Sequence, residues 1–186
     1  MKATHISTLL VTGAISLAAS PAIADLSDVP QFNFACQITD GVPTTVAQST
    51  DGEKTLSVFN WKQDALASKT LSSPKELCDN VTAKLEGYSA DGYDLSHISF
   101  VGTQINEGLP AICATTGRGK CSKVLFTLKP ANNSETVAQD VVAAILNPEL
   151  QDKKIEFNDR GVQSTSYQVD FWDLFNLNLA PKILFK

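Results

Sequence analysis

Four cysteines limit most strongly what this 186-residue chain can fold into: Cys36, Cys78, Cys113 and Cys121. All four follow an apolar N-terminal segment that has the features of an export signal. An even number of cysteines in an exported chain predicts disulfides, whereas a zinc site requires cysteines in closely spaced pairs, which are missing here. The sequence therefore predicts two disulfides and no metal site.

The neighbouring residues favour one of the three possible pairings. Cys36 lies in the alternating run Phe32–Ile38, which predicts a strand with Cys36 facing the core. Cys78 lies on the apolar face of a predicted helix, so it also faces the core. We therefore prefer Cys36–Cys78, with Cys113–Cys121 as a local bridge. The other two pairings remain open, because sequence alone does not determine connectivity.

Residues 1–24 have the features of a cleaved secretory signal. Lys2 precedes an apolar stretch without acidic residues, and Ala22-Ile23-Ala24 forms the small-x-small site before Asp25. A retained membrane anchor is the alternative, since the uncharged run is just long enough to span a bilayer. Pro21 and the well-placed cleavage site favour removal. We predict a protein that works in the periplasm, the thylakoid lumen or the medium.

The part of the chain after residue 24 has the size of one domain and is acidic. It carries 14 basic and 20 acidic residues, a formal charge of −6. This charge opposes nucleic-acid binding, which depends on neutralising phosphates. We predict a single domain over residues 25–172 and a separate apolar segment over residues 173–186.

Hydrophobic periodicity predicts an α+β fold stapled by two disulfides. We expect an antiparallel sheet of about five to seven strands in hairpins, because tight turns join several strand pairs. The predicted strands are 32–38, 44–47, 55–61, 98–105, 110–115 and 124–129. One helix is predicted from Pro74, and a second over about 135–146 with Ser134 as its cap.

The residues show no recognisable catalytic constellation. His97 is the single histidine after the signal, and no Gly-x-Ser-x-Gly elbow is present, so we interpret His97 as a strand-edge side chain. Gly119-Lys120 is not a phosphate loop, because Ala114 and Cys121 replace its first glycine and its Ser or Thr. We expect no nucleotide, no cofactor and no catalytic residue.

The C-terminal stretch 171–185 is unusually apolar, and two interpretations remain open. Its alternation, with Phe175, Leu177 and Leu179 separated by asparagines, is typical of a last strand on the core. The other interpretation is a contact with a membrane surface or a partner. The candidate contact residues are Trp172, Phe175, Lys182 and Phe185.

Several motifs in the middle of the chain resemble one protein family. They are Phe34-x-Cys36, Gly41-x-Pro43-Thr44-Thr45-Val46-Ala47, Trp61, Cys78, Gly108-Leu109-Pro110-Ala111-Ile112-Cys113, and Cys121 followed by Leu125-Phe126-Thr127-Leu128-Lys129-Pro130. In this order they resemble the circadian oscillating protein family of cyanobacteria, over about residues 34–167. Leu77 departs from the arginine that the family often has there. The resemblance implies an exported, membrane-associated protein with no known reaction.

Three functions follow as expectations. The leading one is a non-enzymatic, exported domain, peripherally associated with a membrane, that binds an unidentified protein partner or the membrane surface. The second is a periplasmic carboxylate-dependent hydrolase that acts on surface glycan. The third is a small-molecule-binding or inhibitor-like domain that uses Trp61 and the loop around Arg118.

Overall fold

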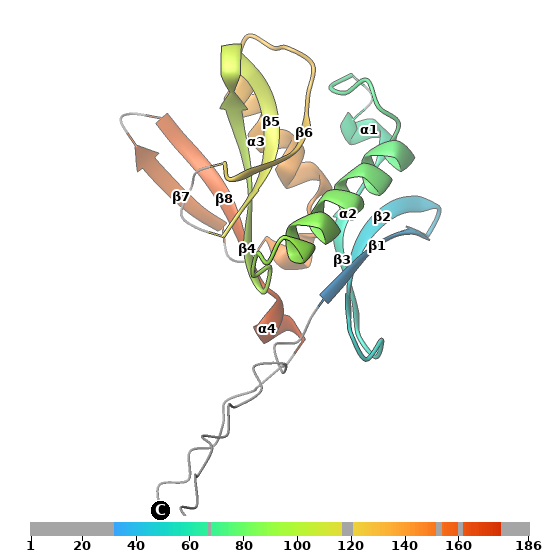
Figure 1. Ribbon diagram of the computed structural model, residues 1–186. Coiled ribbons are helices and arrows are strands. Elements are labelled where there is room, and N and C mark those ends of the chain that lie inside the picture. Colours follow the sequence, from blue (N-terminus) through green and yellow to red (C-terminus); the bar gives the residue numbers. More distant parts are fainter. Residues whose placement is uncertain (1–31, 67, 117–120, 152–153, 160–161, 176–186) are drawn as a thin grey trace, which may run out of the picture.

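The computed structural model describes residues 32–66, 68–116, 121–151, 154–159 and 162–175 (Figure 1). The predicted signal over residues 1–24, Arg118, and the tail residues Lys182 and Phe185 lie outside the described residues.

The first half of the described chain forms a three-stranded antiparallel sheet, which we call sheet A. Its strands are β1 (Phe32–Thr39), β2 (Val42–Ser49) and β3 (Thr55–Asn60), in the order β1-β2-β3. Asp40 and Gly41 connect β1 to β2, and both have positive φ, 52° and 79°. This two-residue turn matches the twist of antiparallel strands, and aspartate followed by glycine is a sequence signal for it.

The second sheet, sheet B, has five antiparallel strands. They are β4 (His97–Ile105), β5 (Leu109–Thr115), β6 (Lys123–Thr127), β7 (Lys154–Asp159) and β8 (Val162–Asp170). Their order is β6-β5-β4-β8-β7, so β8 lies beside β4, although the two strands are far apart in the sequence.

Two long helices cover the two sheets. α2 (Pro74–Ala90) packs on β1 and β2 and reaches β6, whereas α3 (Ser134–Ile145) packs on β4 and β5. The short elements are α1 (Gln63–Leu66), α4 (Phe171–Leu174), and the 3₁₀ turns η2 (Asn106–Gly108) and η3 (Pro148–Leu150). None of the helices in the described residues is long and apolar enough to cross a membrane.

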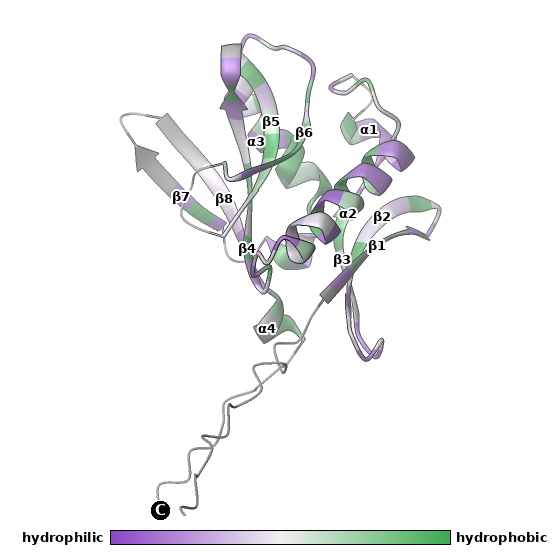
Figure 2. Ribbon diagram, in the orientation of Figure 1, coloured by the Kyte–Doolittle hydropathy of each residue, from purple (hydrophilic) through white to green (hydrophobic). Residues whose placement is uncertain are grey.

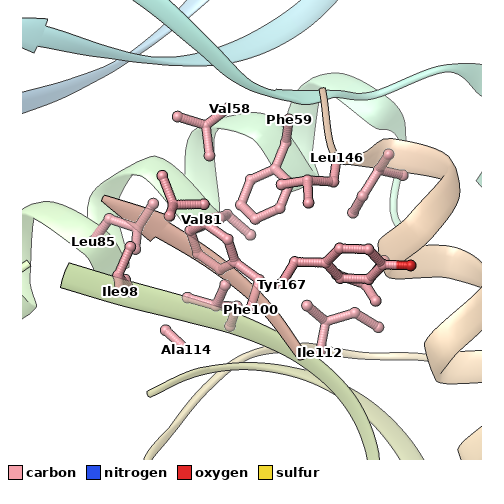
Figure 3. Packing of buried hydrophobic residues seen from close by; sticks show 14 of the residues in the cluster. Val58, Phe59, Val81, Leu85, Ile98, Phe100, Ile112, Ala114, Leu146 and Tyr167 are labelled. Carbon is pink, nitrogen blue, oxygen red and sulfur yellow. The ribbon is translucent and has the colours of Figure 1, made fainter. Parts of the chain in front are cut away.

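Both sheets contribute to one hydrophobic core. Figure 3 shows Phe59 of β3 and Val81 of α2 beside Phe100 of β4 and Tyr167 of β8. The rings of Phe59 and Phe100 lie 4.6 Å apart between centroids in an edge-to-face arrangement. Such aromatic pairs stabilise a core beyond the effect of buried area alone. The two sheets therefore belong to one packed unit.

α3 lies unusually close to sheet B at Gly102. A Cβ added to Gly102 would lie 2.3 Å from the backbone carbonyl atoms of Ala138. Real Cβ contacts are never this short, so only glycine allows the backbones of α3 and β4 to approach in this way.

The predicted α+β class with antiparallel hairpins and two disulfides is confirmed. The strands divide into two sheets, whereas the sequence suggested one. Strands β7 and β8 were not predicted, although Ile155 and Phe157 alternate with polar residues in β7. In β8 the polar run Gln163–Ser166 hides the alternation. The predicted cap Ser134 is wrong: Ser134 is the first residue of α3, and its hydroxyl donates to the carbonyls of Gly108 and Ala131.

Candidate functional site

Both preferred disulfides are present. Cys36 of β1 is bonded to Cys78 of α2, with their Cα atoms 5.6 Å apart. Cys113 of β5 is bonded to Cys121, with a Cα–Cα distance of 5.3 Å. No free cysteine occurs among the described residues. The first bridge fastens a helix to the edge strand of sheet A, and the second closes a local loop on sheet B.

Trp61 does not face solvent. Its side chain is fully buried (0 % exposed), and its indole Nε1 donates to Thr45 Oγ1 at 2.9 Å. The hydroxyl of Thr45 also lies 3.3 Å from that of Thr82 on α2. Buried polar groups require such partners. The burial of Trp61 therefore favours a core role over the alternative role as a ligand contact.

An open groove of about 600 Å³ lies between the β1–β2 hairpin and the start of α2. We call it the distal groove, and its lining includes Val42, Pro43, Lys62, Asp64, Pro74 and Lys75. Ser73 holds the α2 wall in place: its hydroxyl accepts from Glu76 N–H at 3.3 Å, and its own N–H donates to Glu76 Oε2 at 2.8 Å. The hydrogen bond from the Ser73 N–H to the Glu76 carboxylate, together with one from the Ser73 side chain, holds the pKa of Glu76 below its ordinary value.

Ile38 extends the apolar surface beside the distal groove. It pairs with Pro43 in the β1–β2 register, and directly opposed residues project to the same face of a sheet. Its side chain is 60 % exposed, whereas most large hydrophobic residues of the described chain are buried. The hairpin tip therefore presents an apolar edge at the mouth of a groove.

A second cleft, of about 220 Å³, lies at the other end of the domain near α4. Three carboxylates line it, those of Glu149, Asp170 and Asp173. Asp170 Oδ1 accepts from the N–H of Asp173 at 3.1 Å and so caps α4, while Asp170 Oδ2 lies 3.2 Å from His97 Nε2. Both oxygens of Asp170 therefore have structural roles.

His97 belongs to the same network and matches the strand-edge interpretation. It is the first residue of β4, and its Nδ1 lies 3.1 Å from Ser96 Oγ. The Ser96 hydroxyl donates to Asp94 and the residue is buried, so it does not face a substrate. Serine, histidine and aspartate are thus adjacent here, but the serine is not placed as a nucleophile.

The C-terminal residues divide at Phe175. Phe175 is only 2 % exposed, and its ring stacks on that of Phe171 with centroids 6.0 Å apart. Its prediction as a surface contact is wrong, because α4 turns it into the core. Trp172 lies in α4, but the structure does not describe its side chain, so its role as a surface contact stays a prediction. The other interpretation was a last strand over residues 175–179. Its first residue, Phe175, instead ends α4, and residues 176–179 lie outside the described residues.

The fold and its sites define a class: an α+β domain stapled by two disulfides, with a groove at one end. The disulfides indicate a non-reducing environment. Residues 33–176 match the family described as Circadian oscillating protein COP23, and the chain belongs to this family. Among curated proteins and solved structures, none matches this chain.

Sequence reasoning did not find the distal groove, although it predicted two of its parts. The Asp40-Gly41 turn and the helix start at Pro74 were both predicted, but they are 33 residues apart in the chain. The preferred Cys36–Cys78 pairing was a signal that could have placed β1 beside α2, but it does not by itself define a groove.

Proposed function

We propose that this protein is an exported, non-enzymatic interaction domain that is held at a membrane surface by its C-terminal segment. The observation that carries the proposal is the contact between Phe34 and Phe171, whose ring centroids lie 5.9 Å apart. This contact places the start of the described domain beside α4, where the apolar segment begins (Figure 1). The distal groove lies at the other end of β1 and faces away from the membrane.

The packing of α4 gives the apolar segment a firm attachment. Phe171 and Phe175 are buried, and Lys54 donates a hydrogen bond to the carbonyl of Phe175. Leu174 is 41 % exposed beside them. An apolar segment with lysines that follows a rigid attachment point is typical of peripheral membrane association.

The test is the partition of the mature protein between membrane and soluble fractions. Truncation must begin at residue 176, because removing Phe175 opens the core. We expect the intact protein to pellet with membranes and wash off in carbonate, and the truncated protein to stay soluble. A Leu71→Ser variant is the matched control, since it removes an exposed apolar side chain that lies outside the tail. The proposal is wrong if the truncated, folded protein pellets as well as the intact protein.

A second candidate function, a carboxylate-dependent hydrolase for surface glycan, has one observation in its favour. Glu149 and Asp173 line one cleft with Asp170, and paired carboxylates perform acid–base work in glycosidases. The test is the release of reducing ends from surface glycan by the mature protein and by a Glu149→Gln variant. This function requires measurable release that the substitution reduces by about a hundredfold or more.

A further inference from the structure

The outer half of β1 forms an edge of sheet A whose outward backbone groups lack partners within the described residues. Phe34 N–H points away from β2 and donates to Glu86 of α2. Groups on alternate residues of an antiparallel strand point to the same side. The amide and carbonyl groups of Cys36 and Ile38 therefore also point away from β2. Neither residue has a partner for these groups among the described residues.

The opposite side of β2 gives an independent check on this alternation. Pro43 lies opposite Ile38, and its carbonyl accepts from the N–H of Trp61 at 2.9 Å. The backbone groups of Pro43 thus point toward β3. In such a pair the groups of Ile38 must point outward.

The edges of β3 and β6 are covered in the described chain. Outside β3, the N–H of Asn147 donates to the carbonyl of Val58 at 2.9 Å. Outside β6, Lys84 donates to the carbonyl of Leu125 at 2.6 Å, and Tyr88 donates to that of Val124 at 3.3 Å.

The edge strand β7 carries charges instead. Lys154 and Glu156 form an ion pair of 2.8 Å on it, and charged side chains on an edge strand discourage pairing with another chain. The outer half of β1 is not covered by another element of the described chain, and it carries no charged side chain. It carries Gln37, Ile38 and Thr39.

We propose that this edge binds an extended polypeptide segment of a partner protein, which adds a fourth strand to sheet A beside β1. This inference names the partner class of the proposed interaction domain and rests on that proposal. Regularly spaced amide and carbonyl groups are complementary to an extended peptide backbone. An apolar side chain of the partner would lie on Ile38 and Pro43 at the mouth of the distal groove. The Cys36–Cys78 bridge fixes the edge before binding, which lowers the entropic cost of association.

The first experiment uses a short capped peptide of alternating valine and threonine as the probe for the mature protein. Amide hydrogen exchange is measured by NMR with and without the peptide. We expect exchange at Cys36 and Ile38 to slow by about tenfold or more, because strand addition gives each amide an acceptor. Gln37 should not change, since its amide already points toward β2.

A peptide of the same sequence, N-methylated at every residue, is the matched control. It keeps the side chains but cannot form a strand ladder, so we expect no protection. Equal protection by both peptides, or no protection at Cys36 and Ile38 at saturating concentration of the first, overturns the proposal.

Two variants of Ile38 distinguish peptide binding at the β1 edge from non-specific hydrophobic binding. Ile38→Pro removes one outward N–H, and Ile38→Lys keeps it but adds a charge, so both should weaken peptide binding by about tenfold or more. Leu71→Ala, at another exposed hydrophobic residue, should leave binding unchanged. A cooperative thermal unfolding transition, as in the wild-type protein, verifies that both Ile38 variants fold.

Light scattering distinguishes a partner strand from a second copy of this chain. A mass that doubles with concentration and returns to that of the monomer in Ile38→Lys assigns the edge to self-association and overturns the partner proposal. A monomer that gains protection from the peptide supports it. The membrane experiment above uses no peptide, so its failure is separate from failure of this test.

Discussion

α2 and α3 are held on their sheets by different means. α2 lies over a polar patch of sheet A, where Thr45 and Thr82 meet, and the Cys36–Cys78 disulfide bonds it to β1. α3 has no disulfide and lies against Gly102 at backbone contact distance. Figure 2 shows the same contrast, since α3 is mostly hydrophobic whereas α2 mixes both kinds of residue.

The difference shows two ways of attaching a helix to a small sheet. An apolar helix is stabilised by close packing on the sheet, and a glycine in the strand allows the two backbones to approach closely enough. A helix that covers a polar patch is held in addition by a covalent link and by satisfied hydrogen bonds. Four pairs of variants test this account.

Removing the disulfide under α2 should have the largest effect. The bridge Cys36–Cys78 spans 42 residues and Cys113–Cys121 spans 8. Loop-closure entropy predicts losses of about 4 and 2.5 kcal/mol for the respective double alanine variants. Urea unfolding measures both. Equal losses would mean that the Cys36–Cys78 bridge stabilises the fold no more than the short Cys113–Cys121 bridge does. The proposed difference between α2 and α3 would then be wrong.

Gly102→Ala tests the packing of α3. The new Cβ would meet the Ala138 backbone at 2.3 Å, so α3 must shift, at a cost of about 3 kcal/mol. Gly87→Ala on α2 is the matched control. Its added Cβ meets nothing within 4 Å, and alanine should raise the free energy of unfolding by about 0.5–1 kcal/mol. Similar thermal shifts of the same sign for both variants would refute close packing at α3.

Thr45→Val tests the polar patch under α2. Valine keeps the shape but leaves the buried Trp61 N–H without its acceptor, so we expect a loss of about 2 kcal/mol. Thr82→Val removes only the 3.3 Å contact with Thr45 and should cost less than about 1 kcal/mol. Chemical unfolding followed by tryptophan fluorescence measures both. A larger loss for Thr82→Val would place the important hydrogen bond elsewhere.

The smallest effect concerns the helix starts and depends on pH. Hydrogen bonds from Ser73 lower the pKa of Glu76 in the folded state. The stability from this carboxylate is therefore fully present above its ordinary pKa of 4.5 and is lost as pH falls through the lowered value. The difference in unfolding free energy between wild type and Glu76→Gln should shrink between neutral pH and pH ~3.

The start of α3 supplies the control for this measurement. The side chain of Asn133 forms no capping hydrogen bond, so Asn133→Ala should change stability little at any of these pH values. A pH-dependent loss in Asn133→Ala would show that the two helix starts do not differ as described.

Local patterns were sufficient for most elements of the fold. Alternation predicted β1 and β4, and Ser73 with Pro74 and Glu76 predicted the start of α2. The pairing of Cys36 with Cys78 followed because both lie on core-facing sides of predicted elements. These predictions succeed because residue spacing within one element directly reflects which face is buried.

The sequence by itself determined the number of disulfides, the hairpins of β1 to β3 and of β4 to β6, and the two long helices. Only the tertiary structure decided that β8 pairs with β4, that Phe175 turns into the core, and that Ile38 remains at an open edge. Local spacing records which face of an element is apolar. Which edges are covered depends on contacts between residues far apart in the chain, and no local pattern records those.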